Sequence, residues 1–211
     1  MIELFLSAFV TFFVVIDPPG CAPIFAGLTA GTSRAHTHAM ATRAVLVAGA
    51  ILLVFALFGE KLLRGLGITL EAFRIAGGIM LFLIALEMVF EKRTERREER
   101  AQKVREETPA EDISVFPMGM PMIAGPGSIA SVMLLMSRTD GIERTAVVLA
   151  ALAANLLLTL VALRAAGPIM RVMGAKVEAV ITRLLGVLLA ALAAQFVIDG
   201  IRLSLAGPIA H

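Results

Sequence analysis

Tryptophan and tyrosine are absent from this chain of 211 residues, and cysteine occurs once, as Cys21. A lone cysteine excludes an internal disulfide and every CxxC redox or zinc motif. Without Trp and Tyr, an aromatic belt at the membrane surface would have to consist of the 12 phenylalanines. His36 and His38 lie in one expected loop without further His or Cys nearby, so we expect neither a metal site nor a cofactor.

Charge is also scarce. Lys, Arg, Asp and Glu make up 17% of the residues, against about 25% in an average soluble domain. Of the 19 basic and 17 acidic residues, 15 lie in residues 91–112. The net charge of +2, without a basic patch, gives no support to nucleic-acid binding. The chain as a whole has a mean hydropathy of +0.88, which predicts a membrane protein surrounded by lipids.

Six apolar runs are long enough to cross a bilayer core of about 30 Å, which needs about 20 helical residues. They cover residues 4–30, 39–59, 72–90, 113–137, 145–163 and 184–205. None alternates apolar and polar residues as barrel strands do. We therefore predict an all-α polytopic membrane protein with six transmembrane helices in a single membrane domain, residues 1–211. Residues 91–107 are predicted to continue the third helix into water, as far as Pro109.

The distribution of Lys and Arg predicts the orientation. The segments after the first, third and fifth spans carry 2, 7 and 4 of them, whereas the N-terminus, the other two loops and the C-terminus carry 0, 3, 2 and 1. Cytoplasmic loops are enriched in these residues. We therefore expect the 91–112 loop in the cytoplasm and both termini on the periplasmic side of a cell inner membrane.

Residues about 107 positions apart recur in the two halves of the chain. The matches include Pro19-Gly20 with Pro126-Gly127, Arg64 with Arg171, Gly67 with Gly174 and, after a shift of two, Arg74 with Arg183 and Gly77 with Gly186. Each half, residues 1–90 and 113–211, holds three spans, and the charged linker 91–112 joins them. Because an odd number of spans reverses the second half, we predict two inverted three-helix repeats. Arg74 and Arg183 lie at helix starts, where snorkelling to the membrane surface is expected.

The first span is interrupted at residues 17–20 and the fourth at residues 125–127, so helices 1 and 4 are predicted to be broken. Helix breaks at matching positions of inverted repeats indicate the binding site of a secondary transporter. The half-helix after each break presents a partly positive N-terminus, which suits a substrate carboxylate. The substrate-binding candidates are Asp17, Pro18, Pro19, Gly20, Cys21, Gly125, Pro126, Gly127, Ser128 and Asn155.

Three acidic residues within the spans are candidates for ion coupling: Asp17, Glu87 and Asp199. An Asp followed by Pro is also an ordinary helix N-cap. A charged Asp at mid-bilayer costs about 2.5–3.5 kcal/mol and usually faces a polar cavity, so capping and coupling both stay open for Asp17. Glu87 and Asp199 either lie at the membrane surface or relay protons. Asn155 either joins two helices by hydrogen bonds or contacts substrate.

Three stretches of the sequence resemble the MarC family of integral membrane proteins. They are DPPGCAPIF at 17–25, AFRIAGGIMLFLIALEMVF at 72–90 and FPMGMPMIAGPGSIASVM at 116–133. The resemblance covers essentially the whole chain and implies a multi-pass inner-membrane transporter of small neutral amino acids, such as glycine and alanine, coupled to protons. The family often has Asn where this chain has Cys21. A thiol cannot replace the paired donor and acceptor of an amide, so the substrate here can differ.

We therefore expect a secondary transporter of small neutral amino acids that works by alternating access. A passive channel or exporter for small solutes, and a non-transporting membrane scaffold that uses the charged loop for docking, stay open as alternatives. A homo-oligomer also stays open. An enzyme is not expected, because the HExxH, GxSxG and CxxC motifs are absent.

Overall fold

The structure is a computed structural model of the chain and describes residues 1–93, 95–96, 98–99, 102 and 112–205. These residues fold into helices without a strand, as the apolar runs predict. In chain order the elements are α1 (Ile2–Ile16), α2 (Pro18–Leu28), α3 (Arg34–Gly65), α4 (Leu70–Val89), η1 (Ser114–Ile123), α6 (Pro126–Met136), α7 (Ile142–Arg164) and α8 (Ala166–Leu205).

Five of these helical stretches are long and apolar enough to cross a membrane: Ile2–Leu28, Arg34–Gly65, Leu70–Val89, Ile142–Arg164 and Ala179–Leu205. The pair η1 and α6, bent by 53°, makes a sixth span if the pair counts as one. The prediction of an all-helical, multi-pass membrane protein is confirmed. The described part of the chain gives five or six spans, depending on how the bent pair is counted.

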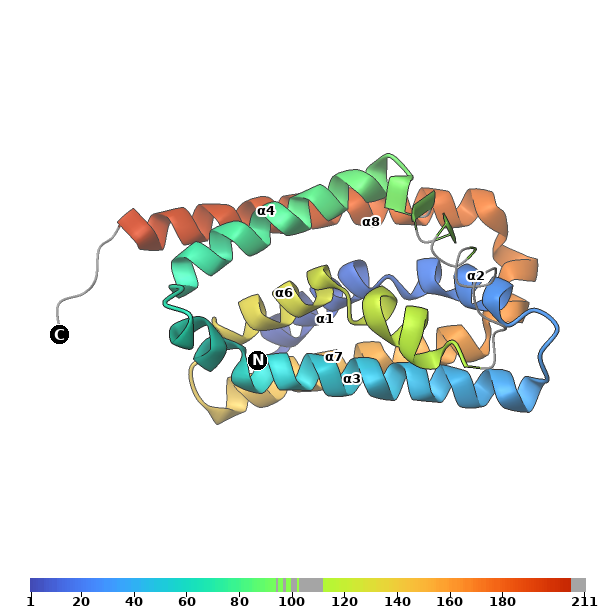
Figure 1. Cartoon of the computed structure of the whole chain (residues 1–211). Helices are drawn as coiled ribbons and strands as arrows, with labels where there is room; N and C mark the ends of the chain where they lie inside the picture. Colours follow the sequence, from blue (N-terminus) through green and yellow to red (C-terminus); the bar gives the residue numbers. More distant parts are fainter. Residues whose placement is uncertain (94, 97, 100–101, 103–111, 206–211) are drawn as a thin grey trace.

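Successive segments run back and forth between two ends of the molecule (Figure 1). In that view α1 with α2, α4 and α7 run from left to right, whereas α3, η1 with α6, and α8 run from right to left. Residues 29–33, the start of the linker at 90–93, and the α7–α8 junction therefore share one end, called here the linker end. Residue 1 and the loops 66–69 and 137–141 share the opposite end. This grouping of loops is the one used for the Lys and Arg counts, and the orientation itself stays a prediction.

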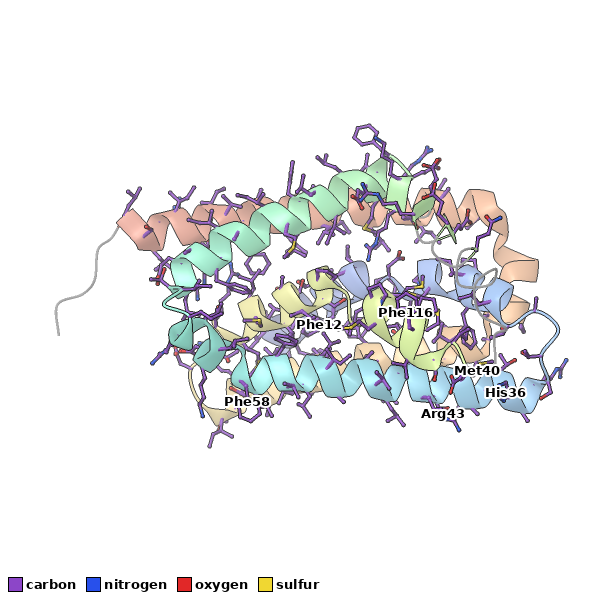
Figure 2. The ribbon with its side chains drawn as sticks, viewed as in Figure 1. Phe12, His36, Met40, Arg43, Phe58 and Phe116 are labelled. Carbon is purple, nitrogen blue, oxygen red and sulfur yellow. The ribbon has the colours of Figure 1, made fainter. Side chains whose placement is uncertain are left out.

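The broken helices form an inner layer between two outer helix pairs. Figure 1 shows α1, α2, η1 and α6 between α4 with α8 on one side and α3 with α7 on the other. The degree of burial agrees with this inner position. In the most apolar stretch of Ile2–Leu28, 56% is buried, whereas the corresponding share in the four unbroken spans is 28–33%. Phe12 is buried in this layer, whereas Phe58 and Phe116 are 55% and 56% exposed, as side chains facing lipid are expected to be (Figure 2).

Small residues let α4 and α8 pack closely along much of their length. A Cβ atom on Gly78 would lie 2.7 Å from Val197 Cγ2, and one on Gly200 would lie 2.8 Å from Ile75 Cγ1. Membrane helices usually associate through close backbone approach at small residues, because the hydrophobic effect does not drive helix association within lipid. The pair α4–α8 thus joins the last span of each half of the chain.

The linker begins with a turn that interrupts the helix rather than with a direct continuation of α4. The helix ends at Val89, and Glu91 takes a left-handed backbone conformation with φ 62°. Arg93 then lies against α1, where its Nη2 donates to the main-chain oxygen of Val15 over 2.6 Å. The predicted continuation of the third helix is therefore interrupted at Glu91, whereas the described residues 92–93, 95–96, 98–99 and 102 are helical again. Pro109 lies outside the described residues.

Asp112 fixes the start of η1 at the other end of the linker. Its Oδ1 accepts hydrogen bonds from the hydroxyl of Ser114 and from the Ser114 amide, the latter at 2.9 Å. Arg43 Nη1 donates to Asp112 Oδ2 at 2.9 Å. The hydrogen bonds from Ser114 and then the charge of Arg43 hold the pKa of Asp112 below its usual value, against the effect of partial burial.

This shift predicts a small, pH-dependent effect of Asp112→Asn. A carboxylate with a depressed folded-state pKa stabilises the fold above its unfolded pKa of about 3.9, and this stability is lost as pH falls through the folded value. We expect the variant to be less stable at pH 7 by at most about 1 kcal/mol, since solvent screens a side chain that is 39% exposed. Thermal unfolding in detergent between pH 3 and 7 measures the difference. A difference that does not shrink toward acid pH would contradict this account.

Candidate functional site

The first helix break is made by a single residue, Asp17. Its backbone is left-handed, with φ 58° and ψ 65°, which is uncommon for a residue other than glycine. Its Oδ1 accepts a hydrogen bond from the amide of Gly20 at 3.1 Å, and Pro18 takes the first position of α2. The side chain is 1% exposed. Asp17 is therefore an N-cap in this structure, and its coupling role stays a prediction.

Two small residues complete the first break. A Cβ atom on Gly20 would lie 2.3 Å from Asp17 Oδ2, so only glycine leaves room for the capping carboxylate. Cys21 is fully buried, and its Sγ donates to the main-chain oxygen of Ile16 at 3.4 Å. A break within a span frees backbone carbonyls that lipid cannot satisfy, and the thiol provides one with a donor.

The second break repeats the hydrogen bond of Cys21 but not the cap of Asp17, because Gly125 has no capping side chain. Between η1 and α6, the hydroxyl of Ser128 donates to the main-chain oxygen of Ile123 at 2.7 Å. Ser128 and Ile123 lie 107 positions after Cys21 and Ile16. In both breaks, a side chain thus satisfies the carbonyl five residues before it.

Matching contacts continue beyond the breaks. The helices α2 and α6 each have 11 residues and begin with proline. The hydroxyls of their C-cap residues, Thr29 and Ser137, each donate a hydrogen bond to a main-chain oxygen in the preceding turn. The acceptors are Phe25, at 2.8 Å, and Leu134, at 2.9 Å. Thr32 and Thr139 then donate to a main-chain oxygen three residues back, each at 2.7 Å. Sequence reasoning missed these hydroxyls, although Thr32 and Thr139 lie 107 positions apart and could have been found by that spacing.

The two breaks lie side by side. A Cβ atom on Gly127, in the second break, would lie 3.2 Å from Val15 Cγ1, two residues before Asp17. It would also lie 2.6 Å from Ile84 Cδ1 of α4. The first half of the chain therefore surrounds the second break with residues of α1 and α4.

A cavity of about 340 Å³ lies beside the second break. Its walls come from α1, α4, η1, α6 and the start of the linker, and consist of Val15, Met80, Leu83, Ile84, Glu87, Arg93, Arg96, Pro121, Met122, Gly125, Pro126, Gly127 and Ser128. The predicted site residues at 125–128 and Glu87 are thus brought together. The predicted residues at 17–21, Asn155 and Asp199 are not among the lining residues.

Opposite charges face this cavity. Glu87 forms an ion pair with Arg96, and Arg93 holds the carbonyl of Val15. The cavity also includes the start of α6, where the first amides of a helix have no partner within it. Such a site can receive a group that carries both a negative and a positive charge. Sequence reasoning missed Arg93 and Arg96 because the turn at Glu91 has no sequence pattern.

Asn155 joins two helices. It is fully buried in α7, and its Nδ2 donates to the main-chain oxygens of Phe9 in α1, at 2.9 Å, and Ala151, at 3.2 Å. Of the two roles left open by the sequence, these contacts match interhelical hydrogen bonding.

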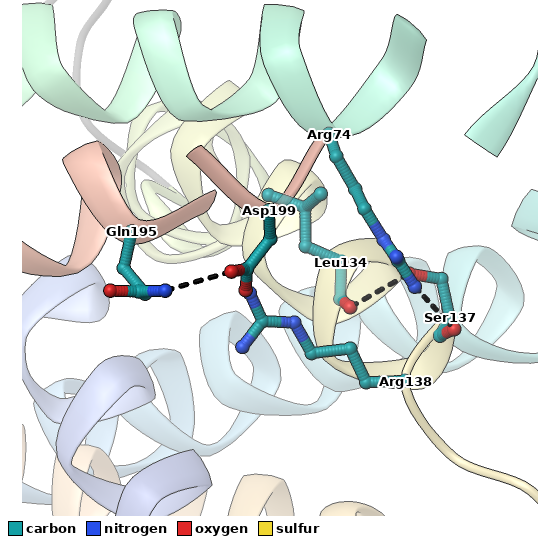
Figure 3. Close-up of polar contacts among 6 residues, drawn as sticks. All are labelled: Arg74, Leu134, Ser137, Arg138, Gln195 and Asp199. Atoms are coloured by element: carbon teal, nitrogen blue, oxygen red, sulfur yellow. Dashed lines mark hydrogen bonds and ion pairs between the residues drawn. The ribbon is translucent and has the colours of Figure 1, made fainter. Parts of the chain in front are cut away.

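A polar cluster lies near the opposite end of the molecule (Figure 3). Asp199 of α8 pairs with Arg138 and accepts a hydrogen bond from Gln195 Nε2 at 2.7 Å. Arg74 of α4 is 9% exposed, and its Nη2 donates to the main-chain oxygen of Ser137 at 2.8 Å. The cluster therefore ties α4 and α8 to the end of α6.

The expected snorkelling of the two arginines is wrong for Arg74, which is buried because it binds the C-cap of α6. Arg183, its match in the second half, is 53% exposed and pairs with Glu91 Oε1 at 2.5 Å. The two matched arginines thus have different partners.

Comparison with known proteins identifies relatives along nearly the whole chain. The family described as "MarC family integral membrane protein" matches residues 2–205. A UPF0056 membrane protein of Methanocaldococcus jannaschii is 36% identical over 190 residues, which are 88% of this chain and 90% of the relative. The membrane protein YvbG of Bacillus subtilis is 35% identical over 89% of both chains, and YhcE of Escherichia coli is 31% identical over 87% of this chain and 85% of its own. No solved structure matches.

Proposed function

This chain belongs to the MarC family of integral membrane proteins, and we propose that it is a secondary transporter of small neutral amino acids. It carries glycine- or alanine-like substrates across the inner membrane by alternating access, coupled to protons. The linker end faces the cytoplasm and both termini face the periplasm. The observation that carries this proposal is the pair of adjacent helix breaks, which repeat one hydrogen bond, with a cavity lined by charges of both signs beside the second break.

The matched hydrogen bonds support an inverted repeat. Cys21 and Ser128 bond equivalent carbonyls, and Thr29 and Ser137 end equivalent half-helices. The two broken spans also run in opposite directions in Figure 1. Inverted repeats that bring two discontinuous helices together are typical of secondary transporters.

The charges at the cavity favour a zwitterion as the substrate. The start of α6 and Arg93 attract a carboxylate, and Glu87 attracts an ammonium group. The remaining walls include Met80, Leu83 and Ile84, which suit a small apolar side chain. The proposal for neutral amino acids rests on this combination together with the family resemblance.

The two ends of the molecule differ from each other, as expected for one conformational state of an alternating-access cycle. The cavity is lined by Glu87, Arg93 and Arg96, which lie toward the linker end, whereas Arg74 binds Ser137 at the opposite end. If the repeats exchange conformations, Arg183 takes the place of Arg74 and binds the C-cap of α2. A passive channel would need no such exchange, and a scaffold would need no charged cavity.

Uptake into proteoliposomes tests the proposal. Radiolabelled glycine or alanine should accumulate above its external concentration when a pH gradient is imposed, and should fall back when an ionophore collapses the gradient. A passive channel would equilibrate the substrate under both conditions. A scaffold would give no uptake above that of empty liposomes, and either result would overturn the proposal.

Asp17→Asn separates the coupling role of this residue from its capping role. Asparagine caps about as well as aspartate but carries no charge. We expect normal membrane levels and thermal stability, with gradient-driven accumulation reduced at least about tenfold. Asp17→Ala, which also removes the cap, should in addition lose stability of about 1 kcal/mol. Full coupled transport by the Asn variant would show that Asp17 acts as a cap alone and would direct attention to Glu87.

A further inference from the structure

A second cavity, of about 330 Å³, opens at the linker end between α2, α3, α7 and the start of α8. Three basic side chains line it: Arg34 and His38 of α3, and Arg164 of α7. The hydroxyl residues Thr29 and Thr37 lie beside them. No acidic residue is found among its described lining residues, so the cavity presents positive charge and hydroxyl groups.

The opposite end of the molecule provides an internal comparison. A cavity of about 260 Å³ there is lined by the equivalents of several residues just described. Thr145, 107 positions after His38, takes the place of that histidine, and Leu57, 107 positions before Arg164, takes the place of that arginine. The acidic residue Glu60 lines this second cavity, and Lys, Arg and His are absent from its described lining. The repeated fold thus produces the cavity twice, and the basic cluster belongs to the linker-end copy alone.

The basic side chains are available to a ligand. Arg164 Nη2 donates to the hydroxyl of Thr42 at 3.0 Å, which orients its guanidinium along α3. Within the part of the chain that the structure describes, neither Arg34 nor Arg164 pairs with a carboxylate. Arginine presents a fork of donors that matches a phosphate, which makes a phosphate-bearing anion the fitting ligand.

We propose that this cavity binds the phosphate of an anionic phospholipid headgroup. It lies at the ends of membrane-spanning helices, where headgroups are found, and apolar residues such as Leu163 and Ala166 share its walls. Basic pockets between transmembrane helices are known to bind such headgroups. The bound lipid contacts both halves of the chain, because α2 and α3 belong to the first half and α7 and α8 to the second. The proposal does not depend on the transported substrate.

The test uses the purified full-length protein in detergent, with thermal stability and native mass spectrometry as readouts. Phosphatidylglycerol should raise the midpoint of thermal unfolding and remain bound, whereas phosphatidylcholine should do neither. Arg164→Leu copies the residue at the equivalent position of the other half and should weaken phosphatidylglycerol binding at least about tenfold. Arg34→Gln, at an exposed helix start, should weaken it similarly. Arg64→Gln, an exposed arginine at the opposite end, is the matched control and should bind as the unmodified protein does.

Each contrary outcome overturns a defined part of the proposal. Equal stabilisation by phosphatidylcholine would remove the role of the anionic headgroup. Equal stabilisation by inorganic phosphate, with loss of lipid binding in competition, would assign the cavity to a soluble anion. Unchanged lipid binding by a folded Arg34→Gln protein and by Arg164→Leu would place the lipid elsewhere.

Discussion

Replacing Gly20 by alanine should remove most of the folded protein from the membrane. The added Cβ would lie 2.3 Å from Oδ2 and 2.8 Å from Cγ of Asp17. The carboxylate cannot stay in place, and its hydrogen bond to the start of α2 is lost in a fully buried region. Overpacking costs about 1–3 kcal/mol, and losing the buried cap adds about 1 kcal/mol. Membrane levels and the midpoint of thermal unfolding measure the effect.

The same helix offers a matched control. Gly27→Ala adds a Cβ with nothing within 4 Å, so this variant should fold normally or gain up to about 1 kcal/mol from its higher helix propensity. Combining Gly20→Ala with Asp17→Gly should restore folding, because glycine accepts the left-handed conformation and removes the clashing carboxylate. Coupled transport should not return with it. If Gly20→Ala alone is as stable as Gly27→Ala, the clash does not control the fold.

Gly127 should tolerate substitution by alanine better than Gly20 does, although the two glycines occupy matching positions in the sequence. Its added Cβ would meet the ends of the side chains of Ile84 and Val15 rather than a capping carboxylate. A flexible side-chain end can shift, so the expected loss is closer to the 1–3 kcal/mol or so of ordinary overpacking. The equivalence of the two glycines in sequence therefore predicts where they lie but not how strictly each is required.

The helical architecture and the positions of the breaks follow from local sequence. Apolar length determines the spans, and the prolines at 18–19 and 126 predict the restart of each broken helix. The match at 107 residues also predicts equivalent contacts, because Ile16 and Ile123 precede the two breaks at the same distance. These features depend on residues close together in the chain, and for that reason they are readable without a structure.

The charged lining of the cavity does not follow from local sequence. Arg93 and Arg96 have the composition of a solvated helix, and only the left-handed turn at Glu91 brings them to the cavity. Arg74 likewise has the pattern of a surface arginine, whereas its burial depends on Ser137, 63 residues later. Such contacts arise from the packing of distant helices, and no periodicity within one helix predicts them.

Loss of Arg74 should open the opposite end of the molecule and abolish most coupled transport. Its guanidinium donates to the main-chain oxygen of Ser137 at 2.8 Å and to the Ser137 hydroxyl at 3.3 Å, which holds α4 against the end of α6. Arg74→Ala removes these bonds while Arg183 keeps its own partner, Glu91. A charge-assisted hydrogen bond contributes about 1.5–3 kcal/mol, so the balance between the two states should shift at least about tenfold.

Accessibility of a cysteine in the cavity reports this shift. Met122→Cys lines the cavity beside the second break, and Cys21→Ser removes the native thiol while keeping a hydroxyl donor. A membrane-impermeant maleimide added from the periplasmic side should label Met122→Cys at least about tenfold faster when Arg74 is alanine. The exposed Arg144 at the start of α7 gives the matched control, since Arg144→Ala should leave labelling unchanged.

Substitution of Arg183, the residue that matches Arg74, tests whether the two ends exchange conformations. In the other state of the cycle, Arg183 is proposed to bind the C-cap of α2 in place of the Arg74 contact. Arg183→Ala then destabilises that state and should slow labelling of Met122→Cys from the periplasmic side. The two alanine variants should thus change labelling in opposite directions, and both should lose proton-driven uptake because each traps one half of the cycle. A simple structural role for Arg74 predicts faster labelling with no opposite effect at Arg183. Changes in the same direction for both variants would rule out the exchange and leave the repeat without a role in alternating access.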